Sequence, residues 1–343
     1  MERHLNTLFI TTEGTYLSQE GQTVKVRRKD STLLRVPLLN LDGIVCFGGV
    51  SCSSSLMAAC AEAGVSVSFH SRNGRFQAAV TGYSPGNVLL RRAQYRNADS
   101  PERSCAIARN LVAAKIANCR TVLLRVIREN DDDHTLPILS AAANSMRQAL
   151  QSARTASSLD VVRGCEGVAA ATYFGVFQHL LTERASRFQF HGRSRRPPLD
   201  EINSLLSFLY AILTHDCRSA CESAGLDSAV GFLHRDRPGR PGMALDLMEE
   251  FRPFLVDRLV LSLLNRKQLK HADFDTAPTG AVALTEHGRR TVLTAWQKRK
   301  QEHLMHPFLE EKTTIGLLVH LQARLMARYL RGDLDAYPPF LSK

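Results

Sequence analysis

The chain lacks any apolar run long enough to cross a membrane as a helix. A membrane-spanning helix needs about 20 consecutive, mostly apolar residues, and every apolar stretch in the 343 residues is interrupted before that length. The opening residues MERHLNTLFITTEGTY also lack the apolar core of a secretory signal peptide. We therefore expect a cytoplasmic protein with no membrane partner.

Paired cysteines are missing as well. The eight cysteines include no CxxC pair and no spacing typical of a zinc finger. Cys217 and Cys221 lie one helical turn apart, which predicts thiols that pack inside a helical core. No histidine or asparagine follows Cys165 in a thiol-hydrolase context, so we do not expect a cysteine nucleophile. The turn at Gly48 and Gly49 lacks the GK[ST] ending of a nucleotide-binding loop.

Acidic residues are outnumbered by basic ones, 33 to 44, which gives a formal charge of +11 and a pI near 9.5. Such a surface favours an anionic partner, most simply nucleic acid, because binding to phosphates releases condensed counterions. No basic amphipathic segment suggests a lipid surface instead. With 44% hydrophobic and 22% charged residues the chain can bury a sizeable core, and its length suggests two domains.

The pattern of the chain predicts an α+β protein. Residues 5–38 alternate branched or aromatic with polar residues, which is typical of short antiparallel strands. A strand and a helix that ends near Gly64 follow, and then two strands joined at Asn73 and Gly74. Helical periodicity begins at Glu102. We expect a small N-terminal β-rich domain, a linker and a larger, mostly α-helical domain, over residues 1–85, 86–100 and 101–343.

An unusual carboxylate interrupts one predicted helix. At about 100° per residue, Glu166 falls at the centre of an apolar stripe formed by Leu159, Val162, Ala169, Ala170, Tyr173, Phe177 and Leu180. A buried carboxylate requires a partner, because an unpaired charge there costs several kcal/mol. Gly164 and Gly167 would let a backbone or a ligand approach closely. The stripe alone fits a metal ligand and a glutamate bonded to an arginine or a helix end equally well.

A second stretch, residues 231–253, combines a histidine, a basic loop and an acidic helix start. Its histidine nitrogen, guanidinium groups and carboxylates suit divalent-metal chemistry on a phosphodiester; they belong to His234, Arg235, Arg237, Arg240, Asp246, Glu249 and Glu250. Drawn as one helix, residues 246–257 place their acids opposite an apolar face, which is typical of a solvated surface. A single histidine is also more often structural than a metal ligand.

Four motifs in these regions closely resemble the CRISPR adaptation integrases, the Cas1 family of metal-dependent DNA integrase-endonucleases. They occur in the family's order and spacing: RGCEGVAAATYF, PLDEINSLLSFLYAIL, GLDSAVGFLH and MALDLMEEFRP, at residues 163–174, 198–213, 225–234 and 243–253. The likeness extends from the N-terminal strands to about Tyr337, and the last two motifs look most like the subtype I-C branch. The resemblance implies a β-rich dimerisation domain joined to a helical catalytic domain.

The resemblance also implies roles for individual residues. The family's metal ligands match Glu166, His234 and Glu249, which would hold Mg²⁺ or Mn²⁺. Asp246 matches an acidic residue that, in relatives, supports the site or helps to bind the metal. Several members carry aspartate in place of Glu249. Glu250 lies nearly as close to Asp246 on the helical wheel and stays open as an alternative, although the family spacing favours Glu249.

The expected function is the joining of 3′-hydroxyl ends of spacer DNA to a CRISPR repeat by transesterification. The resemblance implies a homodimer that works with the smaller adaptation protein Cas2 on double-stranded DNA, both the prespacer and the repeat. Phosphate contacts are expected from two basic loops, through Arg193, Arg195, Arg196, Arg235, Arg237 and Arg240. Two alternatives are a noncatalytic DNA-binding scaffold subunit and a structure-selective DNA nuclease.

Overall fold

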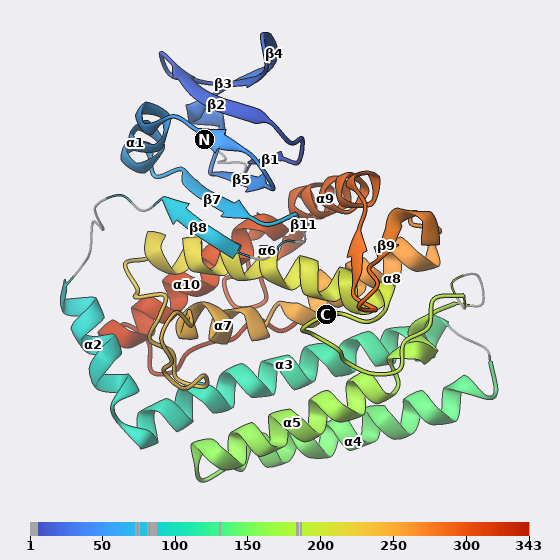
Figure 1. The fold of residues 1–343 in the computed structure, drawn as a ribbon. Helices are drawn as coiled ribbons and strands as arrows, with labels where there is room; N and C mark the ends of the chain where they lie inside the picture. The colour runs from blue at the N-terminus through green and yellow to red at the C-terminus, as the bar shows by residue number, and fades with distance from the viewer. Residues whose placement is uncertain are drawn as a thin grey trace.

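The computed structural model describes residues 6–72, 74, 76–80, 82, 88–129, 132–182, 185 and 187–342. Figure 1 shows a β-rich part, blue, that rests on a larger body of helices. This arrangement confirms the predicted α+β class, with strands first and helices after. No helix in the described ranges is long and apolar enough to cross a membrane.

Two four-stranded sheets form the β-rich part. One has the order β1-β5-β7-β8 and the other β4-β3-β2-β6. Their strands are β1 (Thr7–Ile10), β2 (Thr15–Glu20), β3 (Thr23–Arg28), β4 (Ser31–Pro37), β5 (Gly43–Phe47), β6 (Ser51–Cys52), β7 (Ser66–His70) and β8 (Phe76–Val80). The antiparallel prediction is correct for β2, β3 and β4 but wrong for β1, which pairs parallel with β5. β5 is buried along its whole length, so it needs a partner strand on each side.

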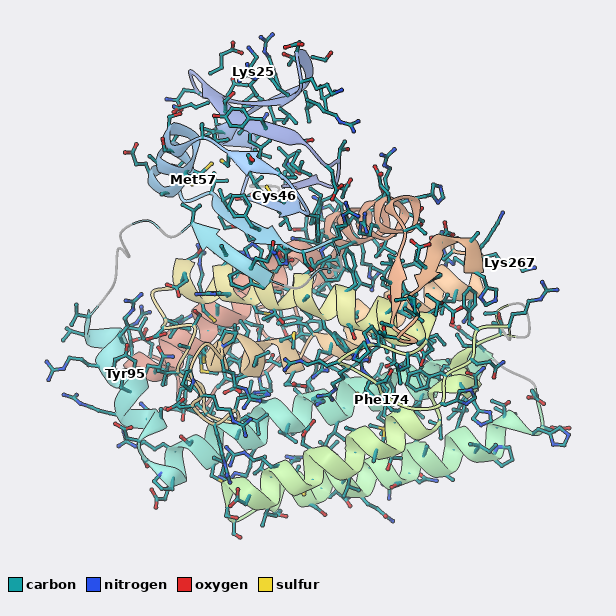
Figure 2. The ribbon with its side chains drawn as sticks, viewed as in Figure 1. Lys25, Cys46, Met57, Tyr95, Phe174 and Lys267 are labelled. Atoms are coloured by element: carbon teal, nitrogen blue, oxygen red, sulfur yellow. The ribbon has the colours of Figure 1, made fainter. Side chains whose placement is uncertain are left out.

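The predicted helix that ends near Gly64 is α1 (Ser54–Ala63), and it connects the two sheets. The Ser53 side chain accepts a hydrogen bond from the Leu56 amide at its start, and Gly64 ends it with a φ of 71°. Leu17, Ile44 and Leu56 are fully buried between α1 and the strands. Cys46, labelled in Figure 2, points into this core and is 1% exposed.

Helices dominate the rest of the chain. They are α2 (Val88–Ala98), α3 (Pro101–Glu129), α4 (Thr135–Thr155), α5 (Leu159–Gly175), α6 (Glu201–Ser223), α7 (Gly242–Glu249), α8 (Arg258–Asn265), α9 (Glu286–Gln301) and α10 (Ile315–Arg331). α2 lies inside the segment predicted as a linker. Two short hairpins, which the sequence patterns did not predict, pair β9 (Phe274–Thr276) with β10 (Val282–Leu284), and β11 (His303–Met305) with β12 (Lys312–Thr314).

The long helix α3 passes through the centre of the helical body, with α4 and α5 along one side and α7 on the other (Figure 1). The β-rich part contacts this body through α6, which lies beneath β7 and β8. There the rings of Phe47 and Phe208 stand 5.6 Å apart, and Ser68 is hydrogen-bonded to His215. Cys217 and Cys221 on α6 are buried and unpaired, as predicted.

Candidate functional site

Glu166 lies in a row of buried residues on α5. The helix begins where the Ser158 side chain accepts a hydrogen bond from the Val161 amide, and Val162, Ala169 and Tyr173 are buried below and above Glu166. The partner that the sequence required is Lys115 of α3, whose ammonium group donates to Oε1 of Glu166. The Glu166 side chain is still 30% exposed.

The glycines beside Glu166 do not admit a neighbouring backbone. A Cβ added at Gly164 or Gly167 would meet no described atom within 4 Å. The close approach of another chain segment, one of the two explanations for these glycines, is therefore not found in the described part of the chain. The space beside this face of α5 is open.

Asp246, near the middle of α7, organises the loop that carries His234. Its two carboxylate oxygens accept hydrogen bonds from the amides of Phe232, Leu233 and His234, at 2.5, 2.9 and 3.0 Å. The same carboxylate lies 2.6 Å from Nδ1 of His234. A carboxylate that already accepts three amide donors is an acceptor here as well, so Nδ1 donates to it, and Nε2 is the ring nitrogen left for another partner. No described group is hydrogen-bonded to Nε2.

Two glycines make this loop possible. A Cβ at Gly231 would come within 2.7 Å of the Gly242 backbone and 2.8 Å of Asp246 Oδ2, and a Cβ at Gly242 would come within 2.6 Å of Ala229. Only glycine at both positions lets the loop lie directly against the first turn of α7. The hydrogen bonds to Asp246 depend on that contact.

Glu249 ends α7 and is 3% exposed. Arg252 donates to Oε1 at 2.8 Å, and the Lys115 ammonium lies 2.7 Å from Oε2. Oε2 is nevertheless buried without a hydrogen bond of normal geometry from any described group. Burial alone would raise the pKa of Glu249, but Arg252 and Lys115 outweigh it and hold that pKa well below its usual range.

Glu250, the next residue, faces away from this cluster. Its oxygens accept hydrogen bonds from Tyr337, from Gln322 at 2.9 Å and from the Phe340 amide at 2.6 Å. Burial raises the pKa of Glu250 to about 7, against the pull of these donors. Its neighbours are neutral and belong to the C-terminal part of the chain, so Glu250 ties that part to α7.

The prediction of a solvated acidic face over residues 246–257 is wrong. Asp246, Glu249, Glu250 and Asp257 are all at most 3% exposed. The wheel assumed one straight α-helix, whereas α7 ends at Glu249 and a π-helical segment, η4 (Arg252–Asp257), follows and changes the phase. Each acid has its own donors, and Asp257 accepts a hydrogen bond of 2.6 Å from Tyr210.

As the side chains stand, the predicted ligands do not form a closed cluster. Within the described residues no three His, Cys, Asp or Glu side chains are placed to hold a metal ion together. Glu166 and Glu249 do not share a free space for an ion, because the Lys115 ammonium lies between their carboxylates. His234 lies close enough to Glu249 to contribute to the lowered pKa of that carboxyl, after Arg252 and Lys115.

The sequence reasoning missed Lys115 and Arg252. Lys115 did carry a signal, since it lies in an α3 row with the apolar residues Ala108, Leu111 and Cys119, where an unpaired lysine would be costly. Arg252 stacks on the Tyr210 ring at 4.1 Å. Both cations contact Glu249: Arg252 is its i,i+3 neighbour, whereas Lys115 comes from another helix, which a wheel of one helix cannot reveal.

The basic residues predicted to bind phosphate differ in their surroundings. Arg193 is hydrogen-bonded to Asn203 and Ser207, and burial lowers its pKa to about 10. Arg235 is 66% exposed and pairs with Asp160 at 2.9 Å. The others are Arg195, Arg196 and Arg237, which are exposed, and Arg240, which is half-buried. Arg193 is therefore engaged within the protein, and the other five are accessible.

A histidine fixed by a carboxylate, two more carboxylates held by cations and an exposed basic loop beside them are typical of enzymes that act on phosphodiesters. The family model described as CRISPR associated protein Cas1 matches residues 8–298. A CRISPR-associated endonuclease Cas1 of Rhodospirillum rubrum is 52% identical over 347 residues, which cover 100% of this chain and 100% of that one. One of Chlorobaculum tepidum is 51% identical over 341 residues, which cover 99% of each chain. The chain belongs to the Cas1 family, the endonucleases of CRISPR adaptation.

Solved structures agree on the fold. A CAS1 protein from Thermotoga maritima superimposes with a TM-score of 0.82 at 22% identity, over 98% of this chain and 100% of that one. A casposase bound to an integration product superimposes with a TM-score of 0.83 at 22% identity, over 96% and 92%. At this identity the likeness shows the shared architecture.

Proposed function

We propose that this chain joins 3′-hydroxyl ends of spacer DNA to a CRISPR repeat by transesterification, at a centre formed by Glu166, His234 and Glu249. The observation that carries the proposal is the convergence of two carboxylates on one cation, beside an oriented histidine. The Lys115 ammonium contacts both Glu166 and Glu249, so one positive charge can bridge their oxygens, while Asp246 binds Nδ1 of His234 and leaves Nε2 without a hydrogen bond from the described residues. Carboxylate oxygens and an imidazole nitrogen suit a divalent ion.

These residues fit Mg²⁺ or Mn²⁺, and the histidine favours Mn²⁺ by ligand softness. A bound ion would polarise the scissile phosphate and assist deprotonation of the attacking hydroxyl. The protein's own contribution is orientation. Asp246 fixes the plane and the tautomer of the His234 ring, and Arg252 keeps Glu249 ionised and in place.

We expect part of a DNA strand to bind one helical turn or more beyond Glu166 along α5. A hollow of about 530 Å³ lies between the C-terminal half of α5 and residues 190–195, and it is lined in part by Phe174, Phe190 and Arg195. Phe174, labelled in Figure 2, marks its position on α5. Aromatic rings beside a cation suit unpaired bases and their phosphates. Arg235, Arg237 and Arg240 would contact further phosphates on the other side of His234.

The rest of the assembly is also part of the proposal. We place the dimerisation domain at residues 1–85 and the catalytic domain at residues 101–343, in a cytoplasmic protein of the subtype I-C branch. Double-stranded prespacer and repeat DNA and Cas2 would be its partners. Support comes from the fold of a chain in a Cas6-RT-Cas1–Cas2 complex, which superimposes with a TM-score of 0.83 at 24% identity over 100% of this chain and 37% of that one.

A joining assay tests the reaction. The protein, Cas2 and Mn²⁺ are incubated with a short duplex and a plasmid that carries the repeat, and covalent products are counted. We expect joining that 3′-dideoxy ends prevent while binding persists, because the 3′-hydroxyl is the nucleophile. Joining with dideoxy ends would contradict this mechanism. Cleavage without joining would favour the nuclease, and binding without either reaction would favour the scaffold.

The basic loop is tested separately. Replacing Arg235, Arg237 and Arg240 together by alanine should weaken DNA binding and flatten its salt dependence, since each phosphate contact contributes about 0.9 to the slope of log K against log salt. Arg290→Ala is the control, because Arg290 lies on α9 and is about as exposed as Arg235, 67% against 66%. An equal loss of slope in both variants would contradict the assignment.

A further inference from the structure

We propose that Lys115 is a built-in counter-ion, which occupies the place of the divalent ion when the centre is metal-free and must leave that place for the ion to bind. This inference rests on the proposed function and adds a residue that sets metal affinity. It starts from one geometric fact. A single ammonium group contacts both carboxylates that the proposal assigns as metal ligands.

The three side chains come from three helices, α5, α3 and α7. Lys115 donates to Oε1 of Glu166 and lies 2.7 Å from Oε2 of Glu249, and its own side chain is only 10% exposed. An oxygen of each carboxylate therefore points at one nitrogen. A divalent ion that used those same two oxygens would have to occupy that nitrogen's position.

Charge explains why the metal-free centre tolerates this burial. Glu166 and Glu249 carry two negative charges, and Lys115 and Arg252 carry two positive charges, so the cluster is neutral before an ion arrives. Without Lys115 one negative charge would be uncompensated beside a buried carboxylate, which is strongly unfavourable. The lysine thus stabilises the empty centre, and an ion that enters must first break two contacts of that lysine.

Arg252 contacts the same cluster but does not occupy the position between the two carboxylates. It donates to Oε1 of Glu249, the oxygen on the other side of the carboxylate, and its guanidinium is stacked on the Tyr210 ring at 4.1 Å. It has no contact with Glu166 among those that the described residues make. Arg252 therefore supplies charge without occupying the shared position, which makes it a matched control for Lys115.

The displaced ammonium has a second use. The lysine arm begins on α3, beside the two carboxylates, so its nitrogen stays next to any phosphate that the ion holds. With three donors and no acceptor, it can then donate to a non-bridging oxygen of that phosphate. Lys115 would first compete with the ion and then contact the substrate.

The test measures Mn²⁺ binding to the full chain by titration calorimetry, in metal-free buffer and without DNA. We expect Lys115→Met to bind Mn²⁺ roughly tenfold more tightly than the wild type, because the ion no longer has to displace an ammonium group from the position between the two carboxylates. The metal-free variant should melt at a lower temperature, and Mn²⁺ should raise its melting temperature by more than it raises that of the wild type. Strand joining at saturating Mn²⁺ should fall, since the phosphate contact is lost.

Controls separate the possible outcomes. Arg252→Met should change the affinity much less than Lys115→Met, and equal tightening in the two variants would mean simple charge removal and would overturn the proposal. Unchanged or weaker Mn²⁺ binding by Lys115→Met would also overturn it, because a merely positioning lysine behaves in that way. Lys115→Gln serves in its place if circular dichroism shows that the methionine variant is unfolded.

The same experiment distinguishes a failure of the proposed function. A wild type that binds Mn²⁺, and a Glu249→Gln variant that does not, would support the centre whatever Lys115→Met does. A wild type that binds no Mn²⁺ would overturn both the metal centre and the counter-ion. Tighter binding by Lys115→Met together with undiminished joining would retain the competition with the ion and overturn the phosphate contact.

Discussion

Glu249 and Glu250 are adjacent, both are buried, and their surroundings have opposite effects. Around Glu249 stand two cations, and one of its oxygens has no regular hydrogen bond from the described residues. Around Glu250 stand neutral donors that use both oxygens. The pKa of Glu249 is lowered, whereas burial raises that of Glu250 to about 7.

The difference shows how one helix end serves two purposes. Cations keep a carboxylate ionised, and a divalent ion can take the place of one of them, so Glu249 is suited to binding an ion. Neutral donors fix a carboxylate in place and leave its charge poorly compensated, so Glu250 is suited to holding segments together. Burial and residue type are the same in both cases, and only the neighbours separate them.

The largest expected effect is on activity, at Glu249. Glu249→Gln keeps the shape of the side chain but removes its charge, so we expect strand joining to fall at least about a hundredfold through lost metal binding. The fold should persist, because Lys115 still pairs with Glu166. Joining rates and circular dichroism measure the two effects. Near-normal joining by Glu249→Gln would mean that the charge of Glu249 is not needed for metal binding.

Asp246→Asn tests the support of the centre. An amide offers one acceptor oxygen in place of two, and it can turn its NH₂ group towards the amide donors, so the His234 ring loses its fixed tautomer. We expect joining to fall about 10- to 100-fold, as is usual when the group behind a metal-binding histidine is changed. Mn²⁺ affinity should fall in parallel. A loss of joining with unchanged affinity would indicate that Asp246 acts on the reaction directly.

Glu250→Gln should affect stability instead. The glutamine amide meets donors from Gln322 and Phe340 with one acceptor fewer, which we expect to lower the free energy of unfolding by about 1–3 kcal/mol. Joining at a temperature well below the melting point should be close to that of the wild type. Urea unfolding and the joining assay give the two values. A dead but stable Glu250→Gln would reverse the assignments of the two glutamates.

The pH dependence of stability gives the smallest effect. Glu250 has a folded-state pKa of about 7 against an ordinary 4.5, so the folded state holds its proton more tightly. Its contribution is present at low pH and is lost as the pH rises through about 7. In chelator, the unfolding free energy of the wild type minus that of Glu250→Gln should therefore decrease between pH 4.5 and about 7. A flat difference would mean that Glu250 titrates normally.

Helical periodicity predicted which residues of one helix face the core, but not their partners on other helices. It placed Glu166 in a buried row and required a partner, but the partner, Lys115, lies 51 residues earlier on another helix. Local turn signals predicted α1 and its end at Gly64. They could not predict that β1 pairs parallel with β5, because register between distant strands depends on the assembled sheet.

The wheel failed where the helix changes type. The sequence pattern of residues 246–257 did not predict a π-helical segment. Spacing within the resemblance favoured Glu249, and the contacts of Glu250 with the C-terminal part are consistent with that choice. The roles of Glu166, His234 and Glu249 stay predictions until the variants are measured.

Residues 337–342 give the helical body a particular order of assembly during synthesis. Asn118 donates to the Phe340 carbonyl and accepts from the Ser342 amide, and Glu250 accepts from Tyr337 and Phe340. A ribosome has translated α3 and α7 long before it reaches these partners. The nascent chain therefore carries Asn118 and Glu250 without these hydrogen bonds until residues 337–342 have emerged. Removing residues 337–342 would leave both side chains without these partners.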